Sequence, residues 1–574
     1  MARFYLRSFI ILLFTIGYSI TTNAQVYQFA KSIGSTNTDI GYSVAVDASG
    51  NIYTTGAFQG TVDFDPGTGS FNLTANGSFD VFLTKLDKQG NFVWAKQWGG
   101  SVDDRGYALA IDAGGNIYVT GYFKGQSDMD PGAGKVNFTA VGADDIFISK
   151  LNPAGDLIWT KQIGGTDVDR AKSIAVDAAG NVVTTGYFIG TCDFDPGATT
   201  GNLVSSANTS DIFILKLNVT GDYVWAKRFG VASLDEGHSI TVDAAGNIYT
   251  TGEYGGTVDF DPGTGTTNLN CIGVYDIFVL KLDASGALVW AKSMGGEGYE
   301  TGNAIAVDAS GNVFTTGLFE DVCDFDPSAA QFNLTTAGGI GTIDNDIYIS
   351  KLTSAGNFSW AKRIGALNDD ISYALKIDAY GNVYAAGAFH DLVDFDPSAA
   401  TANLAASGLS DIFILKLNNG GAYLWAKQIG AGAEEMAFGI AVDGAENVYT
   451  TGQFQGGGVD FDPGTGVAAL NSNGDYDAFL VKLGKYKAGI ETGNNSNSIS
   501  VAPNPVNHFT NIYLGEANTN ATIIVADILG NTIYSLENIN EANARLDLSN
   551  LPAGMYLLKV ISEGSQSSLK LLKN

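Results

Sequence analysis

Seven acidic pairs of the form DxDP recur along the chain, and acids at this spacing could hold a metal ion. In an extended strand the two acids of a pair point to one side and the residue between them points to the other. Paired carboxylates in a glycine-rich loop offer hard oxygen ligands, of which Ca²⁺ takes about 6 to 8, counting backbone carbonyls and water. Structural Ca²⁺ is the one cofactor that the pattern suggests, with candidate ligands Asp63, Asp65, Asp128, Asp130, Asp193, Asp195, Asp259, Asp261, Asp324, Asp326, Asp394, Asp396, Asp460 and Asp462.

The same acids could fix a turn without any metal. Each carboxylate can accept hydrogen bonds from backbone N–H groups of its loop, while the proline sets the direction in which the chain leaves. The spacing is not that of an EF-hand loop, D-x-[DN]-x-[DN]-G, so we favour turn fixing over calcium binding. Under either interpretation the motif is scaffold. The residue between the acids should anchor the loop in the core; it is Phe64, Phe194, Phe260, Phe325, Phe395, Phe461 and, as the exception, Met129.

The sequence carries no established catalytic motif. Its three histidines, His238, His390 and His508, occupy no recurrent position, and no HExxH, GxSxG or glycine-rich phosphate loop is present. A glycosidase needs one carboxylate pair with different proton affinities, not seven similar pairs. We therefore expect a protein that is not an enzyme.

The composition indicates a large, acidic, all-β protein. At 574 residues the chain exceeds what one hydrophobic core can serve. Its formal charge of -29 would repel nucleic-acid phosphates, so nucleic acid is excluded as a partner. The 73 glycines, with 25 tyrosines and 32 phenylalanines, are typical of short strands joined by tight turns.

A seven-fold internal repeat defines the architecture. The turn VDASGN and its copies place an anchor aspartate in each unit, at Asp47, Asp112, Asp177, Asp243, Asp308, Asp378 and Asp443. Each unit contains four extended stretches, such as YSVAVD, NIYTTGAF, DVFLTKLD and NFVWAKQWG. Each unit is therefore expected to form a four-stranded antiparallel blade.

The last unit lacks its fourth stretch, and the first residues supply it. VYQFAKSIG, from Val26, is similar to NFVWAKQWG, with Phe29 in the tryptophan place. A strand from the N-terminus that completes the last blade would remove an open sheet edge. We therefore predict a seven-bladed β-propeller that is closed by its N-terminal strand.

Aromatic and thiol side chains read as core residues rather than as sites. One tryptophan per blade is more typical of packing between sheets than of sugar stacking, namely Trp94, Trp159, Trp225, Trp290, Trp360 and Trp425. Trp98 breaks the repeat and is also interpreted as core. Cys192 and Cys323 occupy a position that is valine in sister blades, so we expect buried thiols rather than a disulfide.

Most recurring acids should share one face of the propeller. The DxDP loops, the start of the third stretch at Asp80 and the connection to the next blade all fall on that face. Each connection is acidic too, with examples at Asp39, Asp103, Asp104, Glu300 and Asp370. An acidic partner surface, for a glycan or protein ligand, is the resulting expectation. The loop of the fifth blade carries five extra residues around Gly338 to Thr342, which we expect to affect ligand choice.

The repeats resemble a family of bacterial seven-bladed β-propellers marked by VDxxGNxYxTG, as in VDASGNIYTTG. The resemblance covers roughly 26–483 and implies the fold. It implies little about activity, because such propellers are mostly uncharacterised exported or surface proteins and one fold serves many functions.

The two ends of the chain indicate export. Residues 1–24 are expected to be a signal peptide: Arg3 and Arg7 precede an apolar run, and Ala24 is the predicted cleavage point. The domains are then 25–483 propeller, 484–499 linker and 500–574 a small Ig-like β-sandwich, with no transmembrane segment in the mature chain. The last of these, with VAPNPV at Val501 and LSNLPAGMYLLKV, resembles the C-terminal sorting domains of type IX secretion substrates in the Bacteroidetes. That resemblance implies the type IX secretion machinery as a partner, passage across the outer membrane, and release or attachment at the cell surface.

Together these features favour an exported binding or adhesion module, at the outer-membrane surface or outside the cell. Two alternatives remain, a surface polysaccharide-degrading enzyme and a structural coat component. A single non-equivalent carboxylate pair lining a deep pocket would favour the enzyme.

Overall fold

The computed structural model describes residues 25–341, 344–485, 500–502, 506–514, 521–527, 532–541, 543–562 and 565–573. The expected signal peptide, most of the expected linker and Thr342 lie outside these residues. The chain divides into two compact units at Lys485, and each is described by itself. Apart from the short 3-10 helix Ser206–Asn208, all regular structure in the described residues is β, which confirms the predicted all-β class. No described helix is long and apolar enough to span a membrane.

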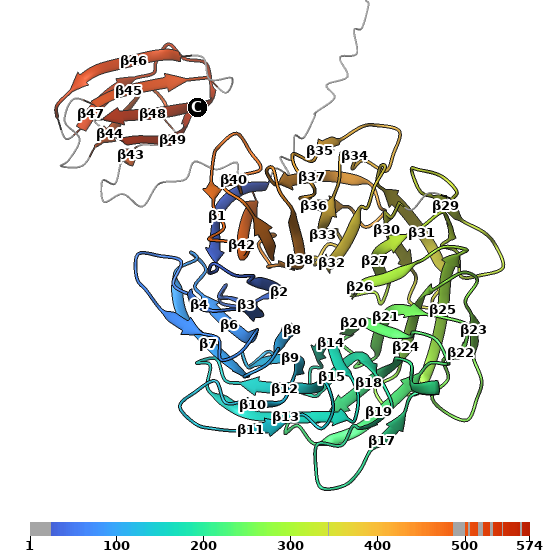
Figure 1. Cartoon of the computed structure of the whole chain (residues 1–574). Coiled ribbons are helices and arrows are strands. Elements are labelled where there is room, and N and C mark those ends of the chain that lie inside the picture. Colours follow the sequence, from blue (N-terminus) through green and yellow to red (C-terminus); the bar gives the residue numbers. More distant parts are fainter. Residues whose placement is uncertain are drawn as a thin grey trace, which may run out of the picture. The chain divides into compact units, whose positions relative to one another are not determined.

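The first unit consists of seven four-stranded antiparallel sheets, here blades 1 to 7 in the order of their anchor aspartates (Figure 1). The innermost strands are β2 (Ile40–Val46), β8 (Arg105–Ile111), β14 (Asp169–Val176), β20 (Glu236–Val242), β26 (Thr301–Val307), β32 (Ile371–Ile377) and β38 (Glu435–Val442). The second strands are β3 (Ile52–Phe58), β9 (Ile117–Phe123), β15 (Val182–Phe188), β21 (Ile248–Tyr254), β27 (Val313–Phe319), β33 (Val383–Phe389) and β39 (Val448–Gln455). The third strands are β6 (Asp80–Leu86), β12 (Asp145–Leu151), β18 (Asp211–Leu217), β24 (Asp276–Leu282), β30 (Asp346–Leu352), β36 (Asp411–Leu417) and β42 (Tyr476–Lys485). The outermost strands are β7 (Phe92–Gly100), β13 (Leu157–Gly165), β19 (Tyr223–Phe229), β25 (Leu288–Gly296), β31 (Phe358–Ile364), β37 (Tyr423–Ile429) and β1 (Gln25–Ile33).

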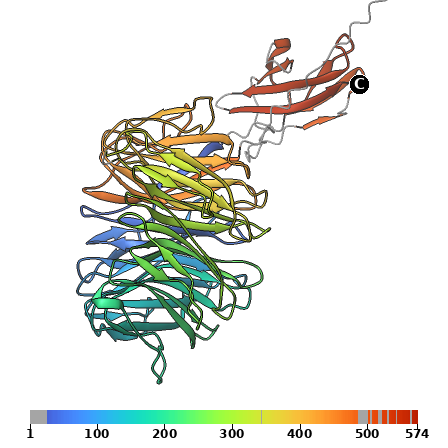
Figure 2. The same ribbon diagram turned by 90° about the vertical axis from the view of Figure 1, so that its right-hand side faces the viewer.

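Seen edge-on in Figure 2, the propeller strands run between two loop-bearing faces. One face carries the VDxxGN turns and the turns between third and fourth strands, and we call it the turn face. The other carries the connections to the next blade and the small hairpins formed by the DxDP segments, and we call it the hairpin face. These hairpins are β4 (Thr61–Asp63) with β5 (Asn72–Thr74), β10 (Gln126–Asp128) with β11 (Asn137–Thr139), β16 (Thr191–Asp193) with β17 (Asn202–Val204), β22 (Thr257–Asp259) with β23 (Asn268–Asn270), β28 (Val322–Asp324) with β29 (Asn333–Thr335), β34 (Leu392–Asp394) with β35 (Asn403–Ala405), and β40 (Val459–Asp460) with β41 (Ala469–Leu470).

The DxDP hairpins join blades to one another, which the sequence did not reveal. Strand β10 of blade 2 pairs with β7 of blade 1, with Ser127 opposite Gly100. Strands β16 and β28 pair in the same way with the outermost strand of the preceding blade. Each such hairpin therefore extends its neighbour's sheet and covers part of that sheet's outer edge.

Most predicted core residues are buried, but of the six repeated tryptophans only Trp425 is buried and the other five are half-buried. The residues between the paired acids are fully buried, Phe64 and Met129 among them, and so are Cys192 and Cys323, which are free thiols. Trp98 is 2% exposed and packs edge-on against Phe147. These observations confirm the expectations of core anchors, buried thiols and a core tryptophan.

The glycine of the VDxxGNxYxTG motif permits a close approach between the two inner strands. A Cβ on Gly121 would stand 1.8 Å from the carbonyl oxygen of Arg105, and one on Gly387 would stand 1.9 Å from that of Ile371. The other five blades show the same approach, at Gly56, Gly186, Gly252, Gly317 and Gly452. Only glycine fits here, because any side chain would collide with backbone.

The N-terminal strand β1 pairs antiparallel with β42, with Gln25 opposite Lys485 and Ile33 opposite Ala478. Phe29 on β1 lies against Gly90 of blade 1, just as Trp94 lies against Gly155 of blade 2. Phe29 thus takes the tryptophan's place, as the sequence predicted. Because the two strands end the propeller segment, blade 7 has no turn between its third and fourth strands.

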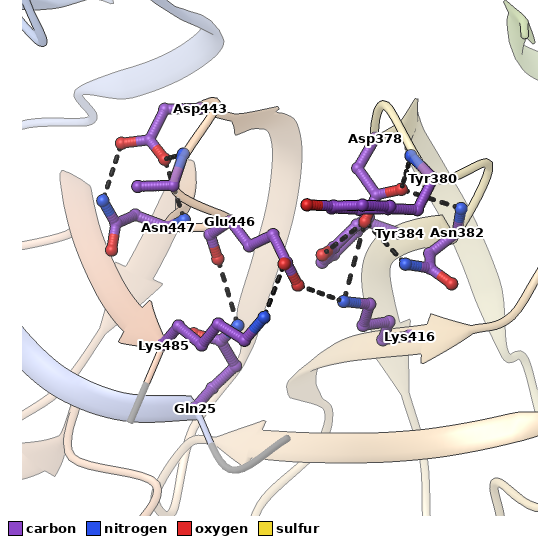
Figure 3. Close-up of polar contacts among 11 residues, drawn as sticks. Gln25, Asp378, Tyr380, Asn382, Tyr384, Lys416, Asp443, Glu446, Asn447 and Lys485 are labelled. Carbon is purple, nitrogen blue, oxygen red and sulfur yellow. Dashed lines mark hydrogen bonds and ion pairs between the residues drawn. The ribbon is translucent and has the colours of Figure 1, made fainter. Parts of the chain in front are cut away.

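That missing turn is compensated by one glutamate. In five other blades the lysine of the third strand donates to a carbonyl in the next blade's turn, as Lys85 does to Pro153 (3.0 Å) and Lys216 does to Ala284 (3.1 Å). Lys416 of blade 6 faces the blade without this turn and pairs instead with Glu446 Oε2 at 3.0 Å (Figure 3). The other oxygen of Glu446 pairs with Lys485 at 2.5 Å, and its backbone carbonyl accepts from Gln25 at 3.1 Å.

Glu446 adopts a left-handed backbone conformation, and the equivalent residue in each of the other six blades is glycine. Its φ is +62°, where blades 1 to 6 have glycine, for example Gly50 at +84°. A non-glycine residue in this region costs about 1 to 2 kcal/mol. The ion pairs of Glu446 offset that cost, since the Lys416 side chain is only 3% exposed.

The second unit is a two-sheet β-sandwich. One sheet has the order β43 (Ser500–Ala502), β44 (Phe509–Tyr513), β47 (Asn543–Asp547). The other has the order β46 (Thr532–Ile539), β45 (Ala521–Ala526), β48 (Gly554–Ser562), β49 (Ser565–Lys573). Side chains of both sheets form one core, with Ile512 and Leu546 from the first and Ile523 and Leu558 from the second.

Replacing a glycine at the close approach of the two inner strands should destabilise the propeller. We expect Gly387→Ala to lower the free energy of unfolding by about 3 kcal/mol, because the added methyl group collides with the Ile371 carbonyl. Gly432→Ala is the control, since a Cβ there meets nothing within 4 Å. Urea unfolding of both variants tests this, and equal stability of the two would contradict the close-approach argument.

The role of Glu446 is measurable as a coupling. Glu446→Gly relieves the strained φ but leaves Lys416 without its closest carboxylate, so we expect a net loss of about 2 kcal/mol. In a Lys416→Met background the same change should cost much less, because only the half-exposed pair with Lys485 is lost and the relief of strain opposes that loss. A double-mutant cycle by urea unfolding gives the coupling, and additive effects would refute the ion-pair argument.

Candidate functional site

Each blade directs one side chain into the hub of the propeller. The pairing of the two inner strands skips one residue of the innermost strand in every blade, which is a β-bulge. Bulges re-aim a side chain and are common beside functional sites. The skipped residues, here called the tunnel ring, are Tyr42, Tyr107, Lys172, His238, Asn303, Tyr373 and Phe438. All seven line a hub cavity of about 520 Å³.

The tunnel ring has an aromatic arc and a polar arc. Tyr42 contacts Tyr107 edge-on with ring centroids 5.0 Å apart, and Phe438 contacts Tyr42 at 5.9 Å and Tyr373 at 5.3 Å. These four rings come from blades 6, 7, 1 and 2 in spatial succession. Lys172, His238 and Asn303 from blades 3, 4 and 5 complete the ring. The cavity therefore has one apolar wall and one wall with hydrogen-bonding and charged groups.

Blades 2, 3 and 4 each carry a charged residue two positions before the tunnel-ring residue, at the hairpin face. Arg105 donates to Tyr42 Oη at 2.8 Å and pairs with Asp103 at 3.2 Å. Arg170 pairs with Asp144 at 2.5 Å and lies 4.4 Å from the centre of the Tyr122 ring. Glu236 occupies the same position in blade 4, whereas blades 1, 6 and 7 have Ile40, Ile371 and Met436. The charge at this mouth of the cavity is thus not seven-fold repeated.

Glu236, His238 and Glu253 of blade 4 form a cluster at this mouth. Their ligand-type atoms all lie within 4.8 Å of one another, and His238 Nε2 is 3.9 Å from Glu236 Oε2. Tyr299 donates to Glu253 Oε2 at 2.7 Å. Burial raises the pKa of Glu236 to about 7 and lowers the pKa of His238. Among the described residues this is the only group of three or more His, Cys, Asp or Glu side chains with such spacing.

Many of the acids that were expected to form a partner surface are buried, which corrects the sequence-based expectation. One acid in each connection is completely buried: Asp39, Asp104, Asp169, Asp235, Glu300, Asp370 and Glu435. These side chains accept backbone N–H groups. Asp104, for example, accepts from Gly100 at the end of blade 1 (2.6 Å) and from Lys124 at the end of the second strand of blade 2 (2.9 Å). They tie consecutive blades together and cannot meet a partner.

The acids that begin the third strands are buried as well, at 0–1% exposure. Asp80 accepts from Asn76 N at 3.1 Å and from Gln97 Nε2 at 2.7 Å. These contacts hold the start of the third strand against the end of the fourth.

The DxDP acids each close a turn of their hairpin. Asp63 Oδ1 accepts from the backbone N–H groups of Asp65 (3.0 Å) and Phe71 (2.8 Å), and Asp65 Oδ1 accepts from Gly67 (2.8 Å). The same three bonds recur in the other six hairpins. These are the contacts that the turn-fixing interpretation requires. Calcium at these pairs stays a prediction.

The tunnel ring is the part of the site that sequence reasoning missed. Contrary to the sequence-based expectation for the histidines, His238 occupies a recurrent position: it stands five residues before its anchor aspartate, as do the other six ring residues. The available signal was variability at an aligned position within otherwise repeated strands. It was overlooked because the expected strands alternate regularly, and a bulge breaks that alternation.

Comparisons with known proteins agree with this architecture. Residues 28–57 and 224–253 match the family model described as a beta-propeller repeat. Residues 500–574 match the model of the secretion system C-terminal sorting domain. Both resemblances stated from the sequence are thereby confirmed.

Two relatives among known proteins match this chain at low identity. An uncharacterized WD repeat-containing protein of Acanthamoeba polyphaga mimivirus is 26% identical over 545 residues, covering 81% of this chain and 39% of that protein. The regulatory protein FlaEY of Caulobacter vibrioides is 26% identical over 159 residues, covering 27% of this chain and 16% of that protein. This chain thus spans well under half the length of either relative. The crystal structure of Sqt1 from Chaetomium thermophilum overlays with a TM-score of 0.36 at 10% identity, covering 80% of this chain and 99% of that one.

The protein is therefore a β-propeller joined to a secretion sorting domain. The sorting domain is that of type IX secretion, which exports its substrates to the cell surface or the extracellular space. The expected export and handling by the type IX machinery follow from this match.

The buried acids predict an inverted pH dependence of stability. Desolvation raises the pKa of Asp39, Asp169 and Asp370 to about 7 and that of Glu300 to about 8, from ordinary values of 3.8 for Asp and 4.5 for Glu. Between the two sets of values the folded chain binds more protons than the unfolded chain, so stability falls as pH rises from about 4 to about 8. We expect a higher melting temperature at pH 5 than at pH 8. Below pH 4 stability should fall again, because hydrogen bonds lower the pKa of turn-face acids such as Asp47.

Thermal melting at pH 3, 5 and 8 measures this dependence. Glu300→Gln is the matched variant, because the amide keeps the shape and does not titrate, so the difference between pH 5 and pH 8 should shrink. A melting temperature at pH 8 equal to or above that at pH 5 would contradict the assignment.

Proposed function

We propose that this exported propeller is a non-catalytic binding module whose ligand enters the tunnel ring from the hairpin face. One observation carries the proposal. The seven ring residues hold equivalent backbone positions but comprise five residue types, while the scaffold positions around them are nearly uniform. A position that only supports the fold has no physical reason to differ between blades, whereas a binding surface needs different groups at different points.

The chemistry of the ring favours a carbohydrate. Tyr42, Tyr107, Tyr373 and Phe438 offer ring faces and edges for the apolar C–H side of a sugar. Lys172, the amide of Asn303 and the imidazole of His238 offer polar groups for its hydroxyl or acidic side. A cavity of about 520 Å³ lies in the size range of small-molecule sites.

The polysaccharide-degrading alternative has one observation in its favour. Glu236 and Glu253 are a carboxylate pair that no other blade repeats, and glycoside hydrolysis uses one such pair. Neither glutamate lines the cavity, where His238 alone represents the cluster. We therefore rank binding above hydrolysis, and release of reducing ends from a bound glycan would reverse that order.

A glycan array probed with the full mature chain tests the proposal. Tyr107→Ala and Lys172→Ala should each weaken binding of any captured glycan at least about tenfold, since each removes one wall of the cavity. Tyr380→Ala is the control, because Tyr380 is an equally large aromatic side chain, 72% exposed on the turn face. Binding that the ring variants leave unchanged, but that deletion of the blade 5 insertion abolishes, would move the site to that loop. Self-assembly without glycan binding would favour the coat component.

A further inference from the structure

The cluster of Glu236, His238 and Glu253 has the composition of a transition-metal site. Two carboxylates and one imidazole are hard and borderline ligands that suit divalent ions such as Zn²⁺ and Mn²⁺. Ligand atoms about 2.0 to 2.2 Å from a shared ion lie at most about 4.4 Å apart. The observed separations, up to 4.8 Å overall and 3.9 Å between His238 and Glu236, need only small side-chain adjustments to meet that limit.

The other six blades act as an internal reference for these three positions. The residues equivalent to Glu236, His238 and Glu253 are Ile40, Tyr42 and Ala57; Arg105, Tyr107 and Tyr122; Arg170, Lys172 and Tyr187; Thr301, Asn303 and Leu318; Ile371, Tyr373 and Ala388; and Met436, Phe438 and Gln453. None of these eighteen residues is Asp, Glu, His or Cys, whereas all three in blade 4 are. The fold forms six times without them, so the blade scaffold does not require this triad.

The surroundings of Glu236, His238 and Glu253 are also typical of metal-binding side chains. His238 Nε2 is shielded from solvent and has no hydrogen-bond partner in the described part of the chain, so a buried lone pair or N–H is left unused. Glu253 is only 7% exposed, and the Tyr299 hydroxyl orients it by donating to Oε2 at 2.7 Å. Metal-binding carboxylates are commonly held by such an outer hydrogen bond.

The rival explanation is that these acids balance the basic residues of blade 3. Arg170, however, forms its ion pair with Asp144 at 2.5 Å. The Lys172 amino group lies 4.6 Å from the Tyr107 ring centre and 5.6 Å from that of Tyr187, and it attracts Glu236 and Glu253 electrostatically without forming an ion pair with either. Simple charge balance also gives no role to an imidazole with an unused nitrogen.

We propose that Glu236, His238 and Glu253 bind one divalent transition-metal ion, of the Zn²⁺ class, at the hairpin-face mouth of the tunnel. Three protein ligands leave a coordination position open, and His238 places the ion at the wall of the cavity. The inference does not depend on carbohydrate binding, because metal alone is the probe and its uptake can succeed where every glycan fails.

Isothermal titration of the metal-stripped mature chain with Zn²⁺, with Ca²⁺ in excess to occupy unspecific carboxylates, tests the proposal. We expect one tight equivalent. Glu236→Gln, His238→Asn and Glu253→Gln should each weaken it by at least about 100-fold, and Tyr299→Phe should weaken it by about 10 to 100-fold, as expected for an orienting group. Lys172→Met should tighten binding, because it removes a nearby positive charge. His390→Asn, a histidine outside the tunnel, is the control and should bind as the parent does.

Two results would overturn the site. One is the absence of a tight equivalent in the parent chain, and the other is an equivalent that survives all three triad substitutions. Melting curves without metal show that each variant is folded, so loss of binding cannot be mistaken for loss of structure. Co²⁺ in place of Zn²⁺ gives a second readout, since its visible absorption reports imidazole and carboxylate coordination directly.

Discussion

The architecture depends on one close approach of backbone to backbone, repeated in every blade. The carbonyl at the start of each innermost strand comes so near the glycine of the second strand that no side chain could stand between them. That approach coincides with the bulge, and the bulge turns one residue per blade into the hub. A motif that reads as a family signature, the TG of VDxxGNxYxTG, is thus the physical condition for having a tunnel ring.

The carboxylates of this protein form two groups that differ in burial and in structural role. The acids of the blade connections and third-strand starts are desolvated and accept backbone N–H groups, so they act as internal cross-links between strands. The acids of the DxDP turns remain nearer to solvent. The large negative charge is therefore an unreliable guide to a partner surface, since much of it faces inward.

The contacts of Glu446 show how the closed propeller accommodates both ends of the propeller segment. Gln25 and Lys485 lie opposite each other on the turn face, so the chain enters and leaves the propeller there. The tunnel mouth with Arg105, Arg170 and Glu236 lies on the other face.

Repetition let the sequence by itself determine the blades, the replacement of tryptophan by Phe29, and the buried Phe64 and its sisters, because these depend on short-range patterns that recur in seven copies. The sorting domain was determined by single-copy motifs at the C-terminal end of the chain. Only the tertiary structure decided that the DxDP hairpins clasp the preceding blade, that acids such as Asp104 are buried, and that His238 faces a common cavity with six unlike residues. These facts depend on contacts between blades and on a bulge, and neither leaves a periodic trace along one strand.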